Sequence, residues 1–454
     1  MNNYDGARNI ALTLFQTYSA QGNDIVEAIR LAVEQATGFF MDVSKEELFN
    51  DIQAAINISV GSSSILTDED EKHIPWLLEN KADIKWELWN RYRNYLLQRK
   101  KWPLKIVDTI DKTSDEILGL LENPKDHNRS YDRRGLVVGY VQSGKTANFT
   151  GLINKAIDAG YQLVIVLAGM HNNLRSQTQM RLDEEVLGCE TSRKHFKDQK
   201  GAKIGVSTLT GERFVNIGFL TSRDENGDFS RSIASTVSVH PGAQPFLLVV
   251  KKNASVLRNL VKYFRDESPL AEQDPISGRK TVKRVPLLLI DDEADQASIN
   301  TGDVLDEDGK VLEEYDPTTI NKLIRQLYVT FDQRAYVGYT ATPFANIYVH
   351  NAATHDEFGD ELFPNSFIIS LPKPSNYVGP AEFFGLNNEK DRQQPLIRIV
   401  KDADALIPKK QSKEFVPSGV PDSLKEAIHS FILSTAIRRV RGQLKAHNVT
   451  ANAN

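Results

Sequence analysis

The sequence predicts an α/β fold with a central, mainly parallel sheet, and three observations support this. Short, apolar, β-branched runs recur along the middle of the chain, and segments of helical length separate several of them. Alternation of this kind is typical of a parallel sheet with helices on both faces. The composition, 40% hydrophobic and 25% charged residues, is that of a chain that folds around a core.

Residues 1–125 are predicted to form a helical N-terminal domain. Apolar residues recur there at helical spacing, as at Ile25 and Ile29. Between Arg91 and Trp102 basic residues alternate with aromatic ones, a mixture that can hold phosphates and stack bases. A solvated face on an amphipathic helix is the favoured interpretation of this segment.

Residues 126–350 are predicted to hold the sheet, with a polar, irregular insertion at about 190–245 that decorates it. Asp316 and Pro317 are expected to start a helix as N-cap and first helical residue. The other expected elements are strands at 135–141, 162–168, 246–250, 285–290 and 336–339 and a helix at 147–159.

Residues 351–454 are predicted to form a mixed C-terminal region that ends in a helix at 424–444, with apolar residues such as Ile428 and Phe431 along one face. The region shows no second strand–helix alternation. We therefore expect a second nucleotide-binding lobe to be missing from this chain.

Charge and cysteine content limit the function classes. A net charge of −5 provides no bulk basic field, so any nucleic-acid contact must be local. The single cysteine, Cys189, excludes an intramolecular disulfide framework and fits a reducing compartment. The chain starts without a signal peptide and its apolar runs are too short to span a bilayer, so we expect a cytoplasmic location and no membrane partner.

Residues 139–146 read Gly-Tyr-Val-Gln-Ser-Gly-Lys-Thr, which matches the complete phosphate-loop pattern between an expected strand and an expected helix. Amides at the start of the helix cradle phosphates, Lys145 neutralises them, and the Thr146 hydroxyl joins the Mg²⁺ shell. ATP and Mg²⁺ are therefore the expected cofactors. The candidate nucleotide-binding residues are Gly139, Gln142, Ser143, Gly144, Lys145, Thr146 and Ala147.

An apolar strand that ends at Ile290 is followed by Asp-Asp-Glu-Ala-Asp, at residues 291–295. Open α/β sheets place ligands at the carboxyl ends of their strands. We expect Asp292 to hold the metal and Glu293 to polarise the attacking water, with Lys145 as the third catalytic residue.

A third motif, Thr340-Ala-Thr342, follows another expected strand. Small hydroxyl residues at a strand end can donate hydrogen bonds to the carboxylates and relay the state of the nucleotide. Thr340 and Thr342 are therefore the predicted coupling residues.

The order of these three motifs resembles the first RecA-like lobe of superfamily-two helicases and translocases. In more detail, the phosphate loop, Leu-Ala-Gly at 167–169 and Asn-Leu-Arg-Ser-Gln-Thr at 173–178 look like the bacterial Z-one domain family, whose members are described as endonucleases. The resemblance is closest between about 134 and 377. It implies a RecA-like P-loop ATPase that acts on DNA in a bacterial restriction-like antiphage system. The nucleic-acid contacts that it implies are Asn173, Arg175, Gln177, Lys251 and Lys252.

Three interpretations remain open at this point. The first is the DNA-directed ATPase, whose site lacks the arginines that a second RecA-like lobe supplies. The second is a nucleotide-gated scaffold that recruits a partner nuclease or ATPase from the same defence operon, in an oligomer or complex. The third, less favoured, is a metal-dependent endonuclease, because the usual acidic-x-Lys pair on a strand is not found. The scattered histidines predict no zinc site.

Overall fold

The structure is a computed structural model, in which the chain divides into two compact units, Met1–Tyr377 and Val378–Asn454. The residues that it describes are 3–20, 25–56, 63–68, 73–139, 144–196, 199, 201–209, 216–235, 237, 244–268, 271–273, 278, 280–296, 317–347, 362–372, 400–402, 406, 415–417 and 419–440.

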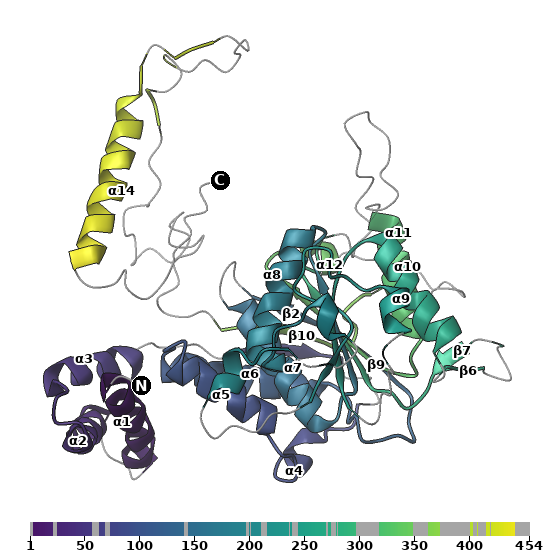
Figure 1. The fold of residues 1–454 in the computed structure, drawn as a ribbon, viewed down its shortest axis with the longest axis horizontal. Helices are drawn as coiled ribbons and strands as arrows, with labels where there is room; N and C mark the ends of the chain where they lie inside the picture. Colours follow the sequence, from purple (N-terminus) through teal and green to yellow (C-terminus); the bar gives the residue numbers. More distant parts are fainter. Residues whose placement is uncertain are drawn as a thin grey trace. The chain divides into compact units, whose positions relative to one another are not determined.

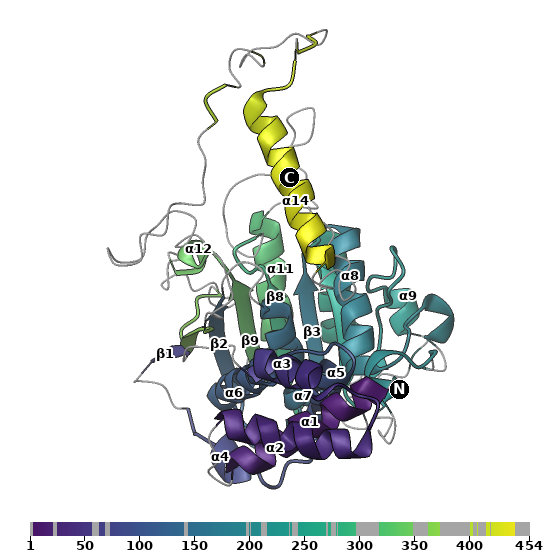
Figure 2. The ribbon, with the colours of Figure 1, turned by 90° about the vertical axis from the view of Figure 1, so that its left-hand side faces the viewer.

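Eight strands of the first unit pair into one sheet, in the order β1-β10-β2-β9-β8-β3-β5-β4. All neighbours are parallel except β1 and β10 at one edge. Figure 2 shows β2, β9, β8 and β3 side by side, which confirms the predicted α/β fold with a mainly parallel sheet. The strands are β1 (Ser64–Thr67), β2 (Tyr131–Val138), β3 (Leu163–Ala168), β4 (Gly218–Phe219), β5 (Phe246–Lys251), β8 (Leu287–Asp292), β9 (Gln333–Thr340) and β10 (Phe367–Ser370).

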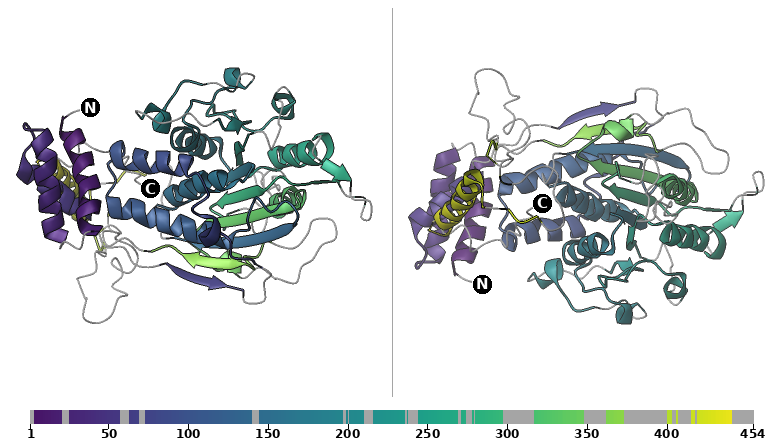
Figure 3. Two further views of the ribbon diagram at one scale, coloured as in Figure 1. Left: turned by 90° about the horizontal axis from the view of Figure 1, so that it is seen from below. Right: turned by 90° about the horizontal axis from the view of Figure 1, so that it is seen from above.

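Helices cover both faces of the sheet (Figures 1 and 3). α7 (Lys145–Ala159) and α8 (Asn172–Leu182) lie on one face, and α10 (Ala254–Lys262) and α11 (Pro317–Val329) on the other. The order of the strands explains why the helices divide between the two faces. Because crossovers between parallel strands are right-handed, helices on the way from β2 to β3 to β5 lie on one face, and those on the way back through β8 and β9 lie on the other. With both faces covered, β3 is buried throughout, which is why it reads as a continuous apolar run.

The sheet also takes strands from both flanking regions. β1 comes from the region predicted to be helical, and it pairs with β10, which comes from the predicted C-terminal region. β10 in turn pairs with β2 and covers what would otherwise be an open sheet edge. The first compact unit runs to Tyr377, beyond the boundary predicted near residue 350.

Two helices that precede the boundary predicted near residue 125 pack with the sheet-containing part of the chain. Helices α5 (Glu87–Gln98) and α6 (Leu104–Leu120) pack against α7, and Leu88 and Leu118 lie in the same hydrophobic core as the sheet. These helices therefore belong to the sheet-containing unit. Arg91, in the basic–aromatic segment, is buried and donates to the carbonyl of Val186, whereas Arg99 and Lys101 are exposed, so part of the segment is a solvated face.

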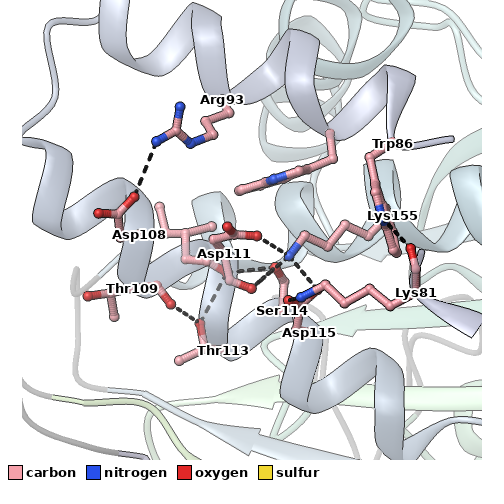
Figure 4. Close-up of polar contacts among 12 residues, drawn as sticks. Lys81, Trp86, Arg93, Asp108, Thr109, Asp111, Thr113, Ser114, Asp115 and Lys155 are labelled. Atoms are coloured by element: carbon pink, nitrogen blue, oxygen red, sulfur yellow. Dashed lines mark hydrogen bonds and ion pairs between the residues drawn. The ribbon is translucent and has the colours of Figure 1, made fainter. Parts of the chain in front are cut away.

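A buried lysine joins α6 to α7 (Figure 4). The Lys155 ammonium lies 2.5 Å from a carboxylate oxygen of Asp111 and 2.6 Å from one of Asp115, and 4.3 Å from the centre of the Trp89 ring. Lys81 reaches the other oxygen of Asp115 from the protein surface. The helix that starts at the phosphate loop is thus fixed to α6 by ion pairs.

The first three helices bury a smaller core of their own, to which Ala11, Ile29 and Leu48 contribute. No helix among the described residues is long and apolar enough to cross a membrane. The remaining elements are α1 (Asn3–Ala20), α2 (Ile25–Phe39), α3 (Lys45–Ile56), α4 (Leu77–Asn80), α9 (Arg231–Ala234), α12 (Phe344–Ile347), α14 (Asp422–Val440), β6 (Ala271–Gln273), β7 (Lys280–Val282), π-helical turns at Asp183–Leu187 and Tyr263–Glu267, and 3₁₀ turns at Arg193–His195 and Gly205–Thr208.

The predicted insertion at about 190–245 does more than decorate the sheet. Within its described part, Phe196, Phe219 and Phe229 are buried, and β4 adds an edge strand next to β5. The segment therefore forms part of the hydrophobic core, although its sequence is mostly polar.

Candidate functional site

The phosphate-loop residues that the structure describes lie where β2 ends and α7 begins. The Gly139 amide donates to the carbonyl of Thr340 over 3.0 Å. A Cβ atom on Gly139 would approach Cγ of Lys145 to 2.8 Å, so the Lys145 stem packs directly on this glycine. Gly144 precedes α7 with φ +97°, a conformation that favours glycine.

The other predicted nucleotide-binding residues divide into two groups. Thr146 and Ala147 lie in the first turn of α7, where free backbone amides and the positive end of the helix dipole favour an anion. The Ala147 side chain is fully buried, so only its backbone could contact a nucleotide. Gln142 and Ser143 lie outside the described residues.

The acidic residues form a tight turn, residues 291–296, at the carboxyl end of β8. We call it the acidic turn. The Gln296 amide donates to the carbonyl of Glu293 over 2.9 Å, and the Ala294 amide to that of Tyr339 over 2.9 Å. Asp291 is buried, Asp292 is partly buried and Glu293 is exposed. Glu293 has φ +55°, which is rare for a residue other than glycine and is found mostly where surrounding contacts impose it.

The charges of the acidic turn act on the phosphate-loop lysine. Burial lowers the pKa of Lys145, and the negative charges of three carboxylates, those of Asp292, Glu293 and Asp295, oppose this shift. The pKa of Asp292 is itself raised to about 6, mainly by burial and by repulsion from Glu293. A cation beside Asp292 would favour the ionised form of this carboxylate.

Thr340 and Thr342, the predicted coupling residues, donate hydrogen bonds to the last carboxylate of the acidic turn. Thr340 Oγ1 donates to Oδ1 of Asp295 over 2.8 Å, and Thr342 Oγ1 donates to Oδ2 over 2.5 Å. The Thr342 amide in turn donates to Thr340 Oγ1 over 2.9 Å. The predicted hydrogen bonds between these hydroxyls and the carboxylates are therefore present, and they form because β9 lies between β2 and β8 in the sheet.

The predicted nucleic-acid contacts separate into exposed and buried residues. Asn173 and Gln177 are exposed on α8, and Lys251 is partly buried with its ammonium 3.0 Å from Oδ1 of Asn172. Arg175 is fully buried, and its guanidinium donates to the carbonyl oxygens of Ser222 and Asp224. The prediction for Arg175 is therefore wrong, because these internal acceptors hold it inside the protein.

Lys252 is likewise fully buried, and the prediction that it contacts nucleic acid is also wrong. Its ammonium lies 2.6 Å from Oδ1 of Asp291 and donates to the carbonyls of Glu293, over 2.8 Å, and Gln296, over 3.0 Å. Successive side chains of a strand point to opposite sides, so the period of two at the end of β5 could have separated Lys251 from Lys252.

Sequence reasoning also missed a polar connection beneath the phosphate loop. The Tyr339 hydroxyl donates to Oδ1 of Asn148 over 2.9 Å, and Asn148 Nδ2 donates to Thr113 Oγ1 over 2.7 Å. All three residues are buried. The only available signal was an asparagine among the apolar residues of α7.

The donor set fits a metal-bound nucleotide. Thr146 and Asp292 provide one hydroxyl and one carboxylate, and Mg²⁺ in such sites is bound by one or two protein groups together with phosphates and water. No cluster of three or more His, Cys, Asp or Glu residues suited to a metal is present in the described part of the chain. A scan against protein-family models and a search of curated proteins found no match to this chain.

Proposed function

We propose that this chain binds ATP with Mg²⁺ and hydrolyses it as the first RecA-like lobe of a helicase-like ATPase. One observation carries the proposal: the phosphate loop, Thr340 and the acidic turn lie at the ends of three neighbouring strands, where the Gly139 amide donates to the Thr340 carbonyl and the Thr340 hydroxyl donates to Asp295. The strand order supports it as well, because the strand of the coupling residues lies between those of the phosphate loop and the acidic turn.

Each residue has a distinct role in this proposal. The first turn of α7 and Lys145 bind the phosphates, and Thr146 and Asp292 hold Mg²⁺. Bound Mg²⁺ neutralises charge that develops on the phosphate oxygens. Glu293 accepts a hydrogen bond from the attacking water and orients it toward the terminal phosphate.

Nucleic acid is proposed as the partner that stimulates hydrolysis, in a bacterial restriction-like antiphage system. Asn173, Gln177 and Lys251 remain as candidate contacts. The nucleotide-gated scaffold, which recruits a partner nuclease or ATPase, is the second candidate function. The burial of Arg175 and Lys252 favours the scaffold. Neither side chain is available to nucleic acid, so fewer of the predicted contacts remain.

The test is ATP turnover by the purified chain, alone and with single-stranded or duplex DNA. We expect slow, Mg²⁺-dependent turnover that DNA increases and that Lys145→Ala removes together with ATP binding. Turnover unaffected by DNA would favour the scaffold. ATP binding that survives Lys145→Ala would contradict the proposed site.

A further inference from the structure

Lys252 makes contacts that a role in nucleic-acid binding does not explain. Its side chain is fully buried at the end of β5, next to β3 and two strands away from the acidic strand β8. The Lys252 ammonium donates hydrogen bonds to two backbone carbonyls and forms an ion pair with the Asp291 carboxylate. All three partners belong to the acidic turn.

The carbonyl contacts concern the residue with the unusual backbone. Lys252 donates to the carbonyl of Glu293 itself, the residue at φ +55°, and to that of Gln296 at the end of the turn. A non-glycine residue in this conformation costs about 1–3 kcal/mol and persists only where its surroundings enforce it. Lys252 fixes the peptide group that follows the Glu293 Cα, and the Ala294 amide is fixed by Tyr339.

The Asp291 carboxylate, the other partner of this ion pair, is also held in place by a hydrogen bond. The Tyr336 hydroxyl donates to Oδ2 of Asp291 over 2.7 Å, while Oδ1 faces Lys252. Asp291, Tyr336 and Lys252 are all buried. The turn is therefore anchored from beneath by β5 and β9, whereas the Glu293 side chain remains exposed above it.

We propose that Lys252 is a positioning residue for ATP hydrolysis: it holds the Glu293 backbone so that the carboxylate points at the attacking water. The inference rests on the proposed ATPase function. A catalytic group displaced by about 1 Å loses on the order of 10²-fold in rate. Lys252 is fully buried and acts through the backbone of the acidic turn, so we expect its loss to lower kcat and to leave the affinity for Mg²⁺-ATP unchanged.

The experiment compares single and double variants. Lys252→Met alone leaves the Asp291 charge buried and unpaired, which can unfold the protein. In Lys252→Met/Asp291→Asn the unpaired charge is gone, but the two bonds to the turn carbonyls are lost too. Thermal unfolding identifies folded variants, titration with a fluorescent ATP analogue gives the affinity, and phosphate release gives kcat and KM.

We expect the folded double variant to bind the ATP analogue within about threefold of wild type and to lose on the order of 10²-fold in kcat. Asp291→Asn alone keeps both Lys252 bonds to the turn, so it should turn over at least about tenfold faster than the double variant. Lys81→Met, at an exposed site, controls for the substitution and should keep wild-type kcat.

The outcomes separate the two claims. A double variant with wild-type kcat, in a protein that Glu293→Gln inactivates, would overturn the role of Lys252 and leave the ATPase function standing. Equal loss in Asp291→Asn and in the double variant would also overturn it, because the ion pair alone would then account for the effect. A wild-type chain that does not hydrolyse ATP would overturn the proposed function itself.

Discussion

At the scale of single residues, burial decides which charges are available to a ligand. Lys251 and Lys252 are adjacent and chemically identical, yet one is partly buried and bonded to Asn172 while the other is inside the protein beneath the acidic turn. Cys189 is also buried, which raises the pKa of its thiol to about 11. A thiol of this kind is mostly protonated and unreactive at neutral pH.

Thr340→Val tests the hydrogen bonds of the coupling residues. Valine lacks the Thr340 hydroxyl. The substitution therefore removes the hydrogen bond to Asp295 and the acceptor of the Thr342 amide, and the acidic turn is held less firmly. A hydrogen bond to a charged group contributes about 1.5–3 kcal/mol, so we expect hydrolysis to fall at least about tenfold, with ATP affinity retained.

Thr330→Val is the matched control for this substitution. Thr330 is also buried, and its hydroxyl donates to the carbonyl of Gln326 in α11; it precedes β9, whereas Thr340 is the last residue of that strand. We expect it to cost some stability and no specific activity. Wild-type turnover in Thr340→Val would contradict the coupling role.

At the scale of elements, α7 connects the candidate site to the N-terminal helices. It begins at the phosphate loop, contacts β9 through Asn148 and Tyr339, and is joined to α6 by the Lys155 ion pairs. Near its C-terminal end, Asp158 accepts from the amides of Leu88 and Trp89, over 3.1 and 2.9 Å, and so caps the first turn of α5.

Lys155→Met should destabilise the protein far more than Lys81→Met, although both lysines pair with Asp115. Lys155 is 1% exposed and faces two carboxylates, whereas Lys81 is 48% exposed. Breaking a buried pair costs about 3–5 kcal/mol, and breaking a surface pair about 0–1 kcal/mol. Urea unfolding of the two variants measures the difference, and equal losses would show that α6 is not held by this cluster.

Asp158 predicts a pH dependence of stability. Burial raises its pKa to about 7, so between pH 4 and pH 7 the folded state binds more protons than the unfolded state. The free energy of unfolding therefore falls as pH rises through this range. Asp158→Asn cannot ionise, and its stability should fall less steeply between pH 4.5 and pH 7.5 in urea titrations.

Two variants complete this test. The pKa of Asp228 is also raised, to about 6, which has the same effect on stability. We therefore expect Asp158→Asn to keep part of the dependence of stability on pH. Glu79→Gln removes an exposed carboxylate from α4 and should keep the wild-type slope. An unchanged slope in Asp158→Asn would mean that this carboxyl titrates as it does in the unfolded chain.

At the scale of the molecule, the strands of the sheet come from most of the length of the first compact unit. Its edge strand β1 and its second strand β10 are about 300 residues apart in the sequence, and they pair in register from Ser64 with Ser370 to Thr67 with Phe367. The second unit contains α14, whose large apolar residues are exposed, including those that the sequence places along one face, such as Ile428 and Phe431.

Truncation separates the predicted domain boundaries from the observed ones. A chain of residues 1–377 should fold and unfold cooperatively, because it keeps every strand of the sheet. A chain of residues 126–377 should fail to fold, because it loses β1 and the helices that cover α7. Circular dichroism and thermal unfolding measure both. A stable, cooperatively folded 126–377 chain would restore the boundary predicted from sequence.

The sequence by itself determined the features that depend on neighbouring residues. The phosphate loop, the acidic turn and the Thr340-Ala-Thr342 motif each lie within a few residues of a strand end, and the strand and helix alternation follows from local periodicity. Because parallel strands end at one edge of a sheet, sequence was also enough to predict that Thr340 and Thr342 bind the carboxylates.

Only the tertiary structure decided which polar residues are buried and which distant segments pair. The burial of Arg175 and Lys252, the addition of β1 and β10 to the sheet, and the packing of α5 and α6 on α7 all depend on contacts between residues far apart in the sequence. Apart from the alternation at the end of β5, local pattern does not indicate such contacts, because a lysine is stable both in water and beside a buried carboxylate.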